Sequence, residues 1–188
     1  GGDPSNGIAE RSMAAPGQDA PKLDPAMFCG DIDIQIAADG TWFHEGGPIG
    51  RKNLVKLFAS VLKRDGEGDY WLVTPVERAR IRVDDAPFVA VELQATGTGR
   101  DQRLTFRTNI DAEVTADRDH PLTFRPRPGG EPAPYLSLGG GLSALAIRAV
   151  YYELVALGVV EKRDGEDQFG VWSAGEFFSF GATPGEAD

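Results

Sequence analysis

The sequence predicts an α+β fold built from two duplicated domains, with mostly antiparallel sheets that are each packed by one main helix. Three observations support this class: strand-like runs through most of the chain, two longer segments with helical periodicity, and similar patterns in the two halves. We expect an N-terminal domain at 25–75 and a C-terminal domain at 76–181. Residues 1–24 are small or polar without apolar periodicity, so a disordered leader is expected there, and a disordered tail at 182–188.

Each half is expected to contain, in order, a strand, an aromatic-bearing segment, a loop rich in glycine or proline, a helix, a tight Asp-Gly turn and a strand. The first helix runs from about Arg51 to Arg64, with apolar side chains on one side and basic ones on the other. Arg51 and Lys52 stand in its first turn, where the positive end of the helix dipole disfavours cations. They are either solvated, with Glu45 as a partner, or part of a site for a bound anion.

Further strands are expected where aromatic or β-branched residues gather, or where charged and apolar residues alternate with a period of two. Tyr70–Thr74 and Phe169–Ser173 each follow an Asp-Gly turn. The others are expected at 78–83, 88–93 and 103–108, with hairpin turns at Asp84-Asp85 and at 96–99.

The second helix is expected to begin at Ser143, an N-cap residue that follows three glycines at 139–141, and to reach about residue 160. Gly158 is an alternative end. Almost all of its side chains are apolar, so it should be buried on more than one side. Arg148 is then a cation in an apolar helix and requires either a carboxylate partner or a ligand anion. The glycines are either a flexible helix entry or amide donors to an anion.

Two short patterns recur along the chain. Lys63–Glu67 has the same five residues as 162–166, at an offset of 99 positions, and the pattern that begins at Ile32-Asp33 recurs from Ile110-Asp111, at an offset of 78. Convergence is the alternative, because basic residues followed by glycine are favoured at any helix end. We interpret the two matches together as an internal duplication.

Composition excludes several classes of protein. The chain has 188 residues, and its 41% hydrophobic and 26% charged residues are ordinary for a globular protein. A net charge of -10 opposes DNA or RNA coating and membrane binding. Cys29 is the single cysteine and only two histidines are present, so we expect no disulfide, no metal and no cofactor. Without a targeting signal or an uninterrupted apolar span, the expected location is the cytoplasm.

No motif for a known reaction is present, since the chain lacks a P-loop, a dinucleotide fingerprint, a zinc-protease helix and a nucleophile elbow. His44 is either the general base of a small hydrolase or a hydrogen-bonded structural residue. A basic row is expected to be solvated and paired across strands, without the interleaved aromatic residues that bind single-stranded nucleic acid. Its members are Arg78, Arg80, Arg82, Arg103 and Arg107.

The segments Asp39–His44, Gly47–Phe58, Arg148–Leu154 and Trp172–Gly175 together resemble the bacterial DUF1285 family, whose function is unknown. The resemblance covers about residues 25–181. It implies a duplicated core, a C-terminal half similar to pleckstrin-homology folds, and a signalling role with a site for a nucleotide-like ligand at the interface of the halves. Fold similarity alone does not establish that function.

We therefore predict a regulatory or signalling protein, rather than an enzyme, that binds a small anionic, ring-bearing ligand between its domains. The expected ligand-binding residues are Trp42, His44, Arg51, Lys52, Tyr135, Arg148, Tyr151 and Tyr152. Two alternatives are a small hydrolase with His44 as its base and a protein-interaction module, which predicts an exposed apolar patch. The sequence does not identify a protein partner.

Overall fold

The structure is a computed structural model that describes residues 29–182. The leader expected at 1–24 and residues 183–188 of the expected tail lie outside this range. The described chain forms two compact units, which we call unit 1 (29–35 and 41–82) and unit 2 (36–40 and 83–182). The boundary therefore falls at 82–83 rather than at the expected 75–76, because the strand after residue 77 joins the sheet of unit 1.

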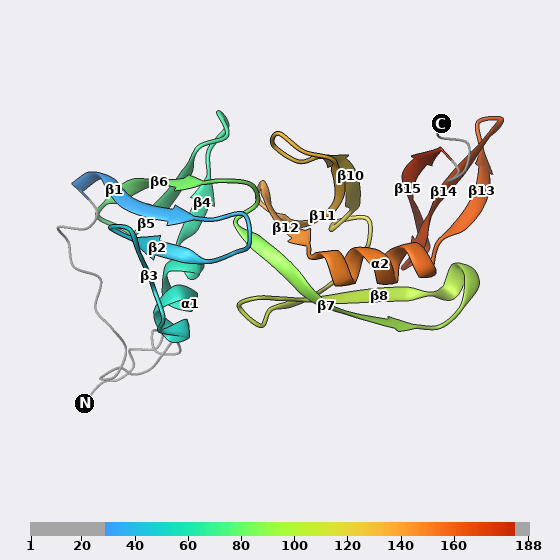
Figure 1. Ribbon diagram of the computed structural model, residues 1–188, viewed down its shortest axis with the longest axis horizontal. Coiled ribbons are helices and arrows are strands. Elements are labelled where there is room, and N and C mark those ends of the chain that lie inside the picture. Colours follow the sequence, from blue (N-terminus) through green and yellow to red (C-terminus); the bar gives the residue numbers. More distant parts are fainter. Residues whose placement is uncertain (1–28, 183–188) are drawn as a thin grey trace. The chain divides into compact units, whose positions relative to one another are not determined.

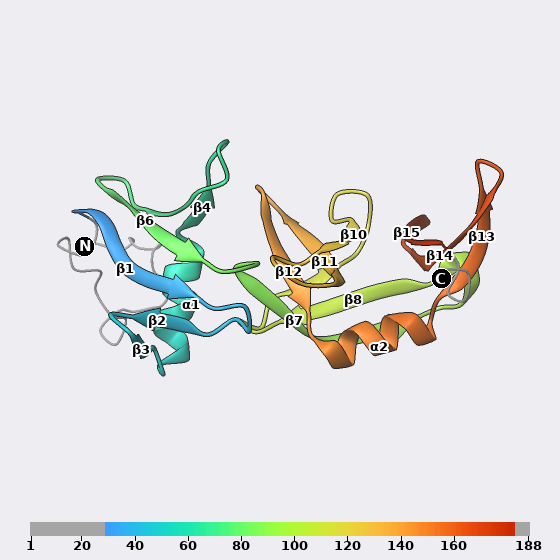
Figure 2. The ribbon, with the colours of Figure 1, turned by 45° about the horizontal axis from the view of Figure 1, so that its top comes forward.

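Unit 1 is a six-stranded sheet with the strand order β3-β2-β1-β6-β5-β4. The strands are β1 (Cys29–Ile36), β2 (Trp42–His44), β3 (Gly47–Pro48), β4 (Leu62–Arg64), β5 (Tyr70–Val73) and β6 (Arg78–Val83). β1 and β6 run in the same direction (Figures 1 and 2), whereas β4, β5 and β6 form an antiparallel meander. Leu62, Leu72 and Ala79 share one register row and are buried. The period of two thus places β5 and β6 as predicted, whereas β4 was not expected as a strand.

The helix of unit 1, α1 (Lys52–Ser60), is shorter than the expected helix at 51–64. It ends at a cap on Val61, and the next three residues pair with β5 as strand β4. The apolar side of α1 buries Val55 and Phe58. The segment therefore contains two elements, because the apolar residues at its end suit a buried strand as well as a helix.

Unit 2 contains a second six-stranded sheet, in the order β10-β11-β12-β7-β8-β9. Its strands are β7 (Phe88–Thr96), β8 (Arg103–Thr108), β9 (Glu113–Thr115), β10 (Leu122–Pro126), β11 (Pro132–Gly139) and β12 (Leu142–Ala146). β12 pairs with β7 in parallel and the other pairs are antiparallel. The hairpin expected at 96–99 is confirmed between β7 and β8, with the short 3-10 helix η4 (Gly99–Asp101) in its loop. The hairpin expected at Asp84-Asp85 is wrong, because those residues lead from one sheet to the other.

The second helix, α2 (Arg148–Ala156), also differs from the expectation. Ser143 is not its N-cap but lies in β12. The glycines at 139–141 all have positive φ, at the end of β11 and in the turn that leads into β12. The alternative end near Gly158 is correct. Only Val150 and Leu154 of the helix are buried, so the expected burial on more than one side is wrong.

A third, three-stranded sheet follows α2 in the order β13-β14-β15. Its strands are β13 (Val159–Arg163), β14 (Glu166–Ser173) and β15 (Glu176–Ala182). Ser173 joins it to the larger sheet: its hydroxyl donates to the Ala116 carbonyl over 2.7 Å and accepts from the Leu104 amide over 2.9 Å. These groups are buried, so the bonds hold β14 against β8 and the residue after β9.

The two six-stranded sheets confirm the duplication by their topology. Strands 1 to 6 of unit 1 have the same order as strands 7 to 12 of unit 2. The residue matches behind the prediction are wrong: Asp33 lies in β1, whereas Asp111 lies in the turn after β8 with a φ of 69°. The two Asp-Gly turns each follow a helix and a short strand, but one joins β4 to β5 of a six-stranded sheet and the other joins β13 to β14 of the separate third sheet. The helices are not duplicated in position, because α1 precedes β4 and α2 follows β12.

Candidate anion-binding site

The predicted ligand-binding residues divide equally between the units. Trp42, His44, Arg51 and Lys52 lie in unit 1, and Tyr135, Arg148, Tyr151 and Tyr152 lie in unit 2. We describe each set within its own unit, and the expected meeting of the two sets stays a prediction.

Trp42 is a core residue of unit 1. Its side chain is 1% exposed, and its ring stacks on Phe58 of α1 with the centroids 6.2 Å apart. The indole Nε1 is buried and has no hydrogen-bond partner in the described part of the chain. The ring is therefore not displayed on the surface of unit 1, and its predicted role against a ligand ring stays untested.

Both helices begin in the same unusual way. Neither N-cap residue, Arg51 for α1 and Ile147 for α2, makes a side-chain capping bond, and neither first turn contains an acidic residue. Each helix instead starts with a cation, Lys52 or Arg148, and both cations are exposed. An uncapped helix start with cationic side chains is a favourable environment for an anion.

Arg148, the cation at the start of α2, makes a hydrogen bond within its own helix. Its Nη1 donates to the Tyr152 hydroxyl over 3.4 Å, and this bond raises the pKa of the guanidinium. No carboxylate lies within ion-pair distance of Arg148 among residues 29–182. The expectation of a buried arginine is wrong, and a structural ion pair does not account for it.

A row of rings continues from Arg148 across unit 2. The centroids of Tyr152 and Tyr151 are 6.2 Å apart, those of Tyr151 and Phe124 are 5.8 Å apart, and those of Phe124 and Phe180 are 5.3 Å apart. The sequence interpretation missed both phenylalanines. Neither β10 nor β15, the two strands that carry them, was expected as a strand.

Tyr135 belongs to a separate cluster. It pairs with Thr123 in the β10–β11 register, and neighbouring residues of a strand point to opposite faces, so Tyr135 and Phe124 face opposite sides of the sheet. Tyr135 is 1% exposed and its hydroxyl donates to Asp85 over 2.7 Å. Burial and the bond to Asp85 raise the pKa of Tyr135 to about 12. Tyr135 is therefore a structural hydrogen-bond donor within unit 2.

His44 lies beside one carboxylate of the described chain, that of Glu45, whose Oε2 is 3.8 Å from the His44 Nε2. The side chain of His44 is 36% exposed. Glu45 has a positive φ of 53° in the tight turn between β2 and β3, which holds it beside the histidine. An ion pair at this distance forms only when His44 is protonated.

The basic row is divided between two sheets. Arg82 of β6 bonds to Asp33 over 2.7 Å, and Arg107 of β8 bonds to Glu92 over 2.7 Å, so pairing across strands is confirmed for both. β6 itself contains no aromatic residue, as expected, but a ring of the neighbouring strand lies against its arginines. The Trp71 ring of β5 lies beneath Arg78 and Arg80, at 4.2 Å and 5.6 Å from their guanidinium carbons.

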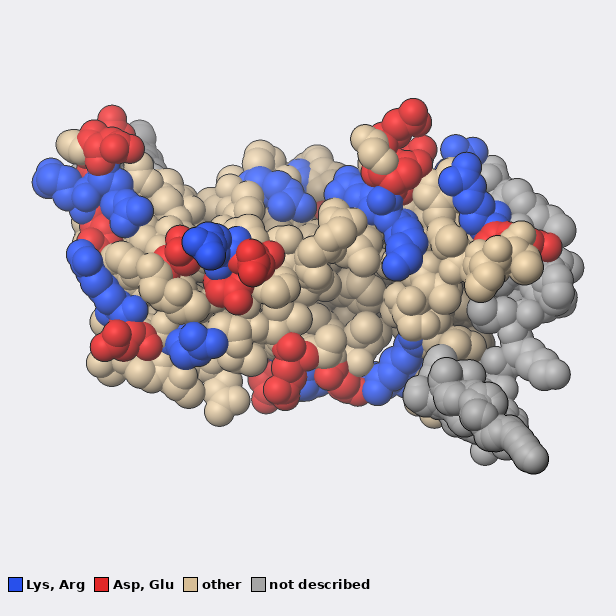
Figure 3. All heavy atoms as spheres, turned by 180° about the vertical axis from the view of Figure 1, so that it is seen from behind, with Lys and Arg blue, Asp and Glu red and all other residues tan. Residues whose placement is uncertain are grey.

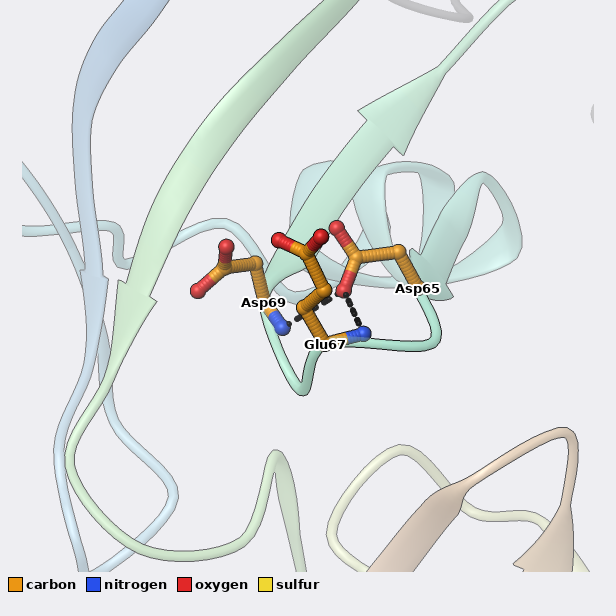
Figure 4. A group of neighbouring side chains, drawn as sticks. All are labelled: Asp65, Glu67 and Asp69. Atoms are coloured by element: carbon orange, nitrogen blue, oxygen red, sulfur yellow. Dashed lines mark hydrogen bonds between the residues drawn. The ribbon is translucent and has the colours of Figure 1, made fainter.

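Three carboxylates, Asp65, Glu67 and Asp69, gather in the turn between β4 and β5 (Figure 4), with one oxygen of each within 4.8 Å of the others. Asp65 Oδ1 accepts the amides of Glu67 and Asp69, and Asp65 Oδ2 accepts the Trp71 indole. The Trp71 bond is the largest cause that lowers the pKa of Asp65. Both oxygens of Asp65 thus accept hydrogen bonds that stabilise the turn, and this role accounts for the position of Asp65 without a metal ion.

Charges of both signs are interspersed on the face seen in Figure 3, where small groups of basic side chains lie beside acidic ones. No broad surface of one sign is visible there. An anion would therefore be recognised by local donors rather than by a wide field.

Two family descriptions match the chain. The N-terminal domain of DUF1285, a domain of unknown function, matches residues 22–86, and the C-terminal domain of the DUF1285 proteins of unknown function matches residues 87–180. The crystal structure of a DUF1285 family protein from Silicibacter pomeroyi DSS-3 is similar, with 45% identity and a TM-score of 0.77, over 95% of this chain and 90% of that one. The chain belongs to the DUF1285 family.

A second DUF1285 structure, from Shewanella baltica OS155, has 30% identity and a TM-score of 0.50, over 65% of this chain and 90% of that one. No curated protein matches the chain. The boundary between the two DUF1285 domains, at 86–87, lies close to the boundary between the two units. Within residues 29–182 of this DUF1285 protein, no helix is both long and apolar enough to cross a membrane.

Proposed function

We propose that this DUF1285 protein is a regulatory binding protein for a small anionic, ring-bearing compound of nucleotide-like chemistry. The observation that carries the proposal is Arg148, an exposed arginine at the uncapped start of α2 and beside two stacked tyrosine rings. Glu131 attracts its guanidinium over a longer distance, but no carboxylate lies within ion-pair distance of it among residues 29–182. A phosphate or carboxylate would bind the guanidinium in a two-pronged geometry.

The groups beside Arg148 favour a ligand that has both an anionic group and an aromatic ring. The free amides at the start of α2 favour negative charge, because they carry the positive end of the helix dipole. Tyr152 is 58% exposed and offers its face to a ring, while its hydroxyl already holds Arg148 in place. An anion on Arg148 and an aromatic ring on Tyr152 would thus be bound side by side.

The test is a thermal-shift screen of the full chain against mononucleotides and dinucleotides, followed by calorimetric titration of the compounds that raise the melting temperature. Arg148 is exposed, so solvent screens the charge-assisted hydrogen bonds that it would make to an anion. Arg148→Ala should therefore weaken binding about tenfold. Arg148→Lys should recover only part of the affinity, because lysine lacks the planar fork.

The matched control is Arg118→Ala, which removes an exposed arginine from the same unit without disturbing α2. This variant should bind as the parent does. Equal losses in the two variants would show that only net charge matters, and unchanged affinity in Arg148→Ala would remove Arg148 from the site. Arg51→Ala and Lys52→Ala test whether the start of α1 contributes to binding of the same compound.

The hydrolase alternative depends on His44 and is tested separately. A screen of phosphatase and esterase substrates should show no turnover that His44→Ala abolishes in a folded variant. Turnover lost in that way would favour an enzyme. The pleckstrin-homology likeness of the C-terminal half, the signalling role and the cytoplasmic location stay parts of this proposal.

A further inference from the structure

Strand β13 is the edge of its sheet. It pairs with β14 on one side, and no strand of the described chain pairs with its other side. Figures 1 and 2 both show it outside β14, with β15 farther in. An unpaired edge presents free backbone amide and carbonyl groups, which can form hydrogen bonds to an added strand.

Exposed apolar side chains concentrate at this edge and on the helix that leads into it. Five large hydrophobic side chains are exposed in the described residues, and four of them lie between residues 152 and 160. They are Tyr152 at 58%, Val155 at 41%, Val159 at 41% and Val160 at 49%. Val159 and Val160 are consecutive in β13, so the strand has an exposed apolar side chain on each face of the sheet.

The size of this surface argues against a stable dimer. Four partly exposed side chains amount to an apolar patch of a few hundred Å² at most, on the order of the patches found on monomers. A stable interface between two globular proteins buries about 800 Å² on each partner. A short extended segment fits better, because main-chain hydrogen bonds would supply most of its affinity.

The charged half of β13 limits which segment fits. Glu161 accepts the Trp172 indole over 3.0 Å, and Lys162 lies 3.3 Å from Asp167, so both have partners within unit 2. The Arg163 guanidinium lies over the Phe177 ring at 5.1 Å, with no carboxylate within ion-pair distance in the described residues. Arg163 is therefore the side chain of β13 that is suited to a carboxylate from a partner.

We propose that β13 receives an extended segment of another protein as a fourth strand of the β13-β14-β15 sheet. The added strand runs beside Val159–Arg163, places apolar side chains opposite Val159 and Val160, and places an acidic side chain opposite Arg163. Tyr152 contributes both to this apolar surface and to the ligand site proposed above, but the strand pairing itself uses β13 and not Arg148.

The experiment uses 12-residue peptides selected by phage display against the immobilised full chain, made synthetically and titrated by fluorescence anisotropy. Selected sequences should combine two neighbouring apolar residues with an acidic residue, and hydrogen exchange should slow at the β13 amides when they bind. Val160→Lys should weaken their binding at least tenfold, because it removes an apolar contact and places a charge against the apolar side chains of the added strand. Arg163→Ala should weaken binding several-fold.

The matched control is Val76→Lys, which changes the fifth exposed hydrophobic residue, in unit 1, where the side chain is 85% exposed. It should leave peptide binding unchanged. The proposal is overturned if the selection yields no binder, if binding persists in Val160→Lys, or if protection from exchange appears away from β13. It is also overturned if the chain dimerises in sedimentation and Val160→Lys makes it monomeric, because a second copy is then the occupant.

Discussion

At the scale of single residues, Tyr135 combines burial with a hydrogen bond to a carboxylate. Burial and the 2.7 Å bond to Asp85 raise the pKa of Tyr135 to about 12. The folded pKa lies above the unfolded value of about 10, so the neutral hydroxyl stabilises the fold fully below that unfolded pKa. This contribution is lost as the pH rises from about 10 through about 12. Among the four tyrosines, Tyr135 should be the last to ionise in an ultraviolet titration.

Tyr135→Phe should remove that last step from the titration, and Asp85→Asn should move it to lower pH, because the carboxylate no longer opposes ionisation. Tyr152→Phe is the control and should leave the last step in place. A last step that persists in Tyr135→Phe would contradict the assignment.

Trp42 has a buried indole N–H without a partner in the described residues. Trp42→Ala should lower the free energy of unfolding by about 3–5 kcal/mol, because it leaves a large cavity against Phe58. Trp42→Phe keeps a ring there and removes the unpaired donor, whose burial costs about 1–3 kcal/mol. It should therefore cost less than about 1.5 kcal/mol. Urea denaturation of both variants measures the difference, and equal losses would contradict this interpretation of Nε1.

The sequence predicted some single residues well and others poorly. Arg51 and Lys52 break the helix-dipole rule at a helix start that the sequence locates to within one residue. Arg148 could be identified as a misplaced charge, but its exposure could not, since that depends on how few residues of α2 face the sheet. The role of Tyr135 depends on its hydrogen bond to Asp85. The two residues are far apart in the sequence, so their contact could not be predicted from local pattern.

At the scale of elements, local pattern predicted strands more reliably than helix limits. The alternation in β6 and the bounds of β8 were correct because a half-buried strand has an obvious period of two. The stretch from 142 to 160 is mostly apolar, so periodicity could not divide it into β12, α2 and the start of β13. The glycines at 139–141 have positive φ and turn the chain from β11 into β12. This turn is why the stretch begins as a strand rather than as a helix.

Two glycines near the third sheet should tolerate alanine differently. At Gly170, an added Cβ would meet the backbone carbonyl of Phe178, which cannot move without breaking the β14–β15 pair. At Gly158, it would meet the tip of the half-buried Phe169 ring, which can rotate away. Gly170→Ala should cost about 3 kcal/mol and Gly158→Ala about 1 kcal/mol in urea denaturation.

The background variant Phe169→Leu distinguishes the two causes. It should abolish the cost of Gly158→Ala and leave that of Gly170→Ala unchanged, because only the first clash involves the ring. If the two glycine variants respond alike on this background, the assigned contacts are wrong.

At the scale of the whole molecule, the duplication could be predicted, but its alignment could not. The equivalent strands, such as β1 and β7 or β6 and β12, share strand order rather than sequence. The repeated Lys63–Glu67 pattern arose at hairpin turns in non-equivalent places, where the same turn chemistry is favoured. Sequence self-similarity thus predicted the duplication correctly, although the residues that were matched lie at non-equivalent positions of the fold.

The net charge of -10 repels an anionic compound at long range, so binding must depend on local donors. Raising the salt concentration from about 0.01 M to about 0.15 M shortens the screening length from about 30 Å to about 8 Å. We expect the affinity of the bound nucleotide to fall over this range in the parent chain and to fall less in Arg148→Ala. Affinity that rises with salt would mean that the long-range repulsion, which salt also screens, outweighs the attraction to Arg148.

The most direct test of the proposed function is the crystal structure of the full chain with the tightest nucleotide from the screen. We predict difference density at the start of α2, with an anionic group within hydrogen-bond distance of the Arg148 guanidinium and a ring on the face of Tyr152. Density for the nucleotide at another surface, with Arg148 still bonded only to Tyr152, would contradict the account.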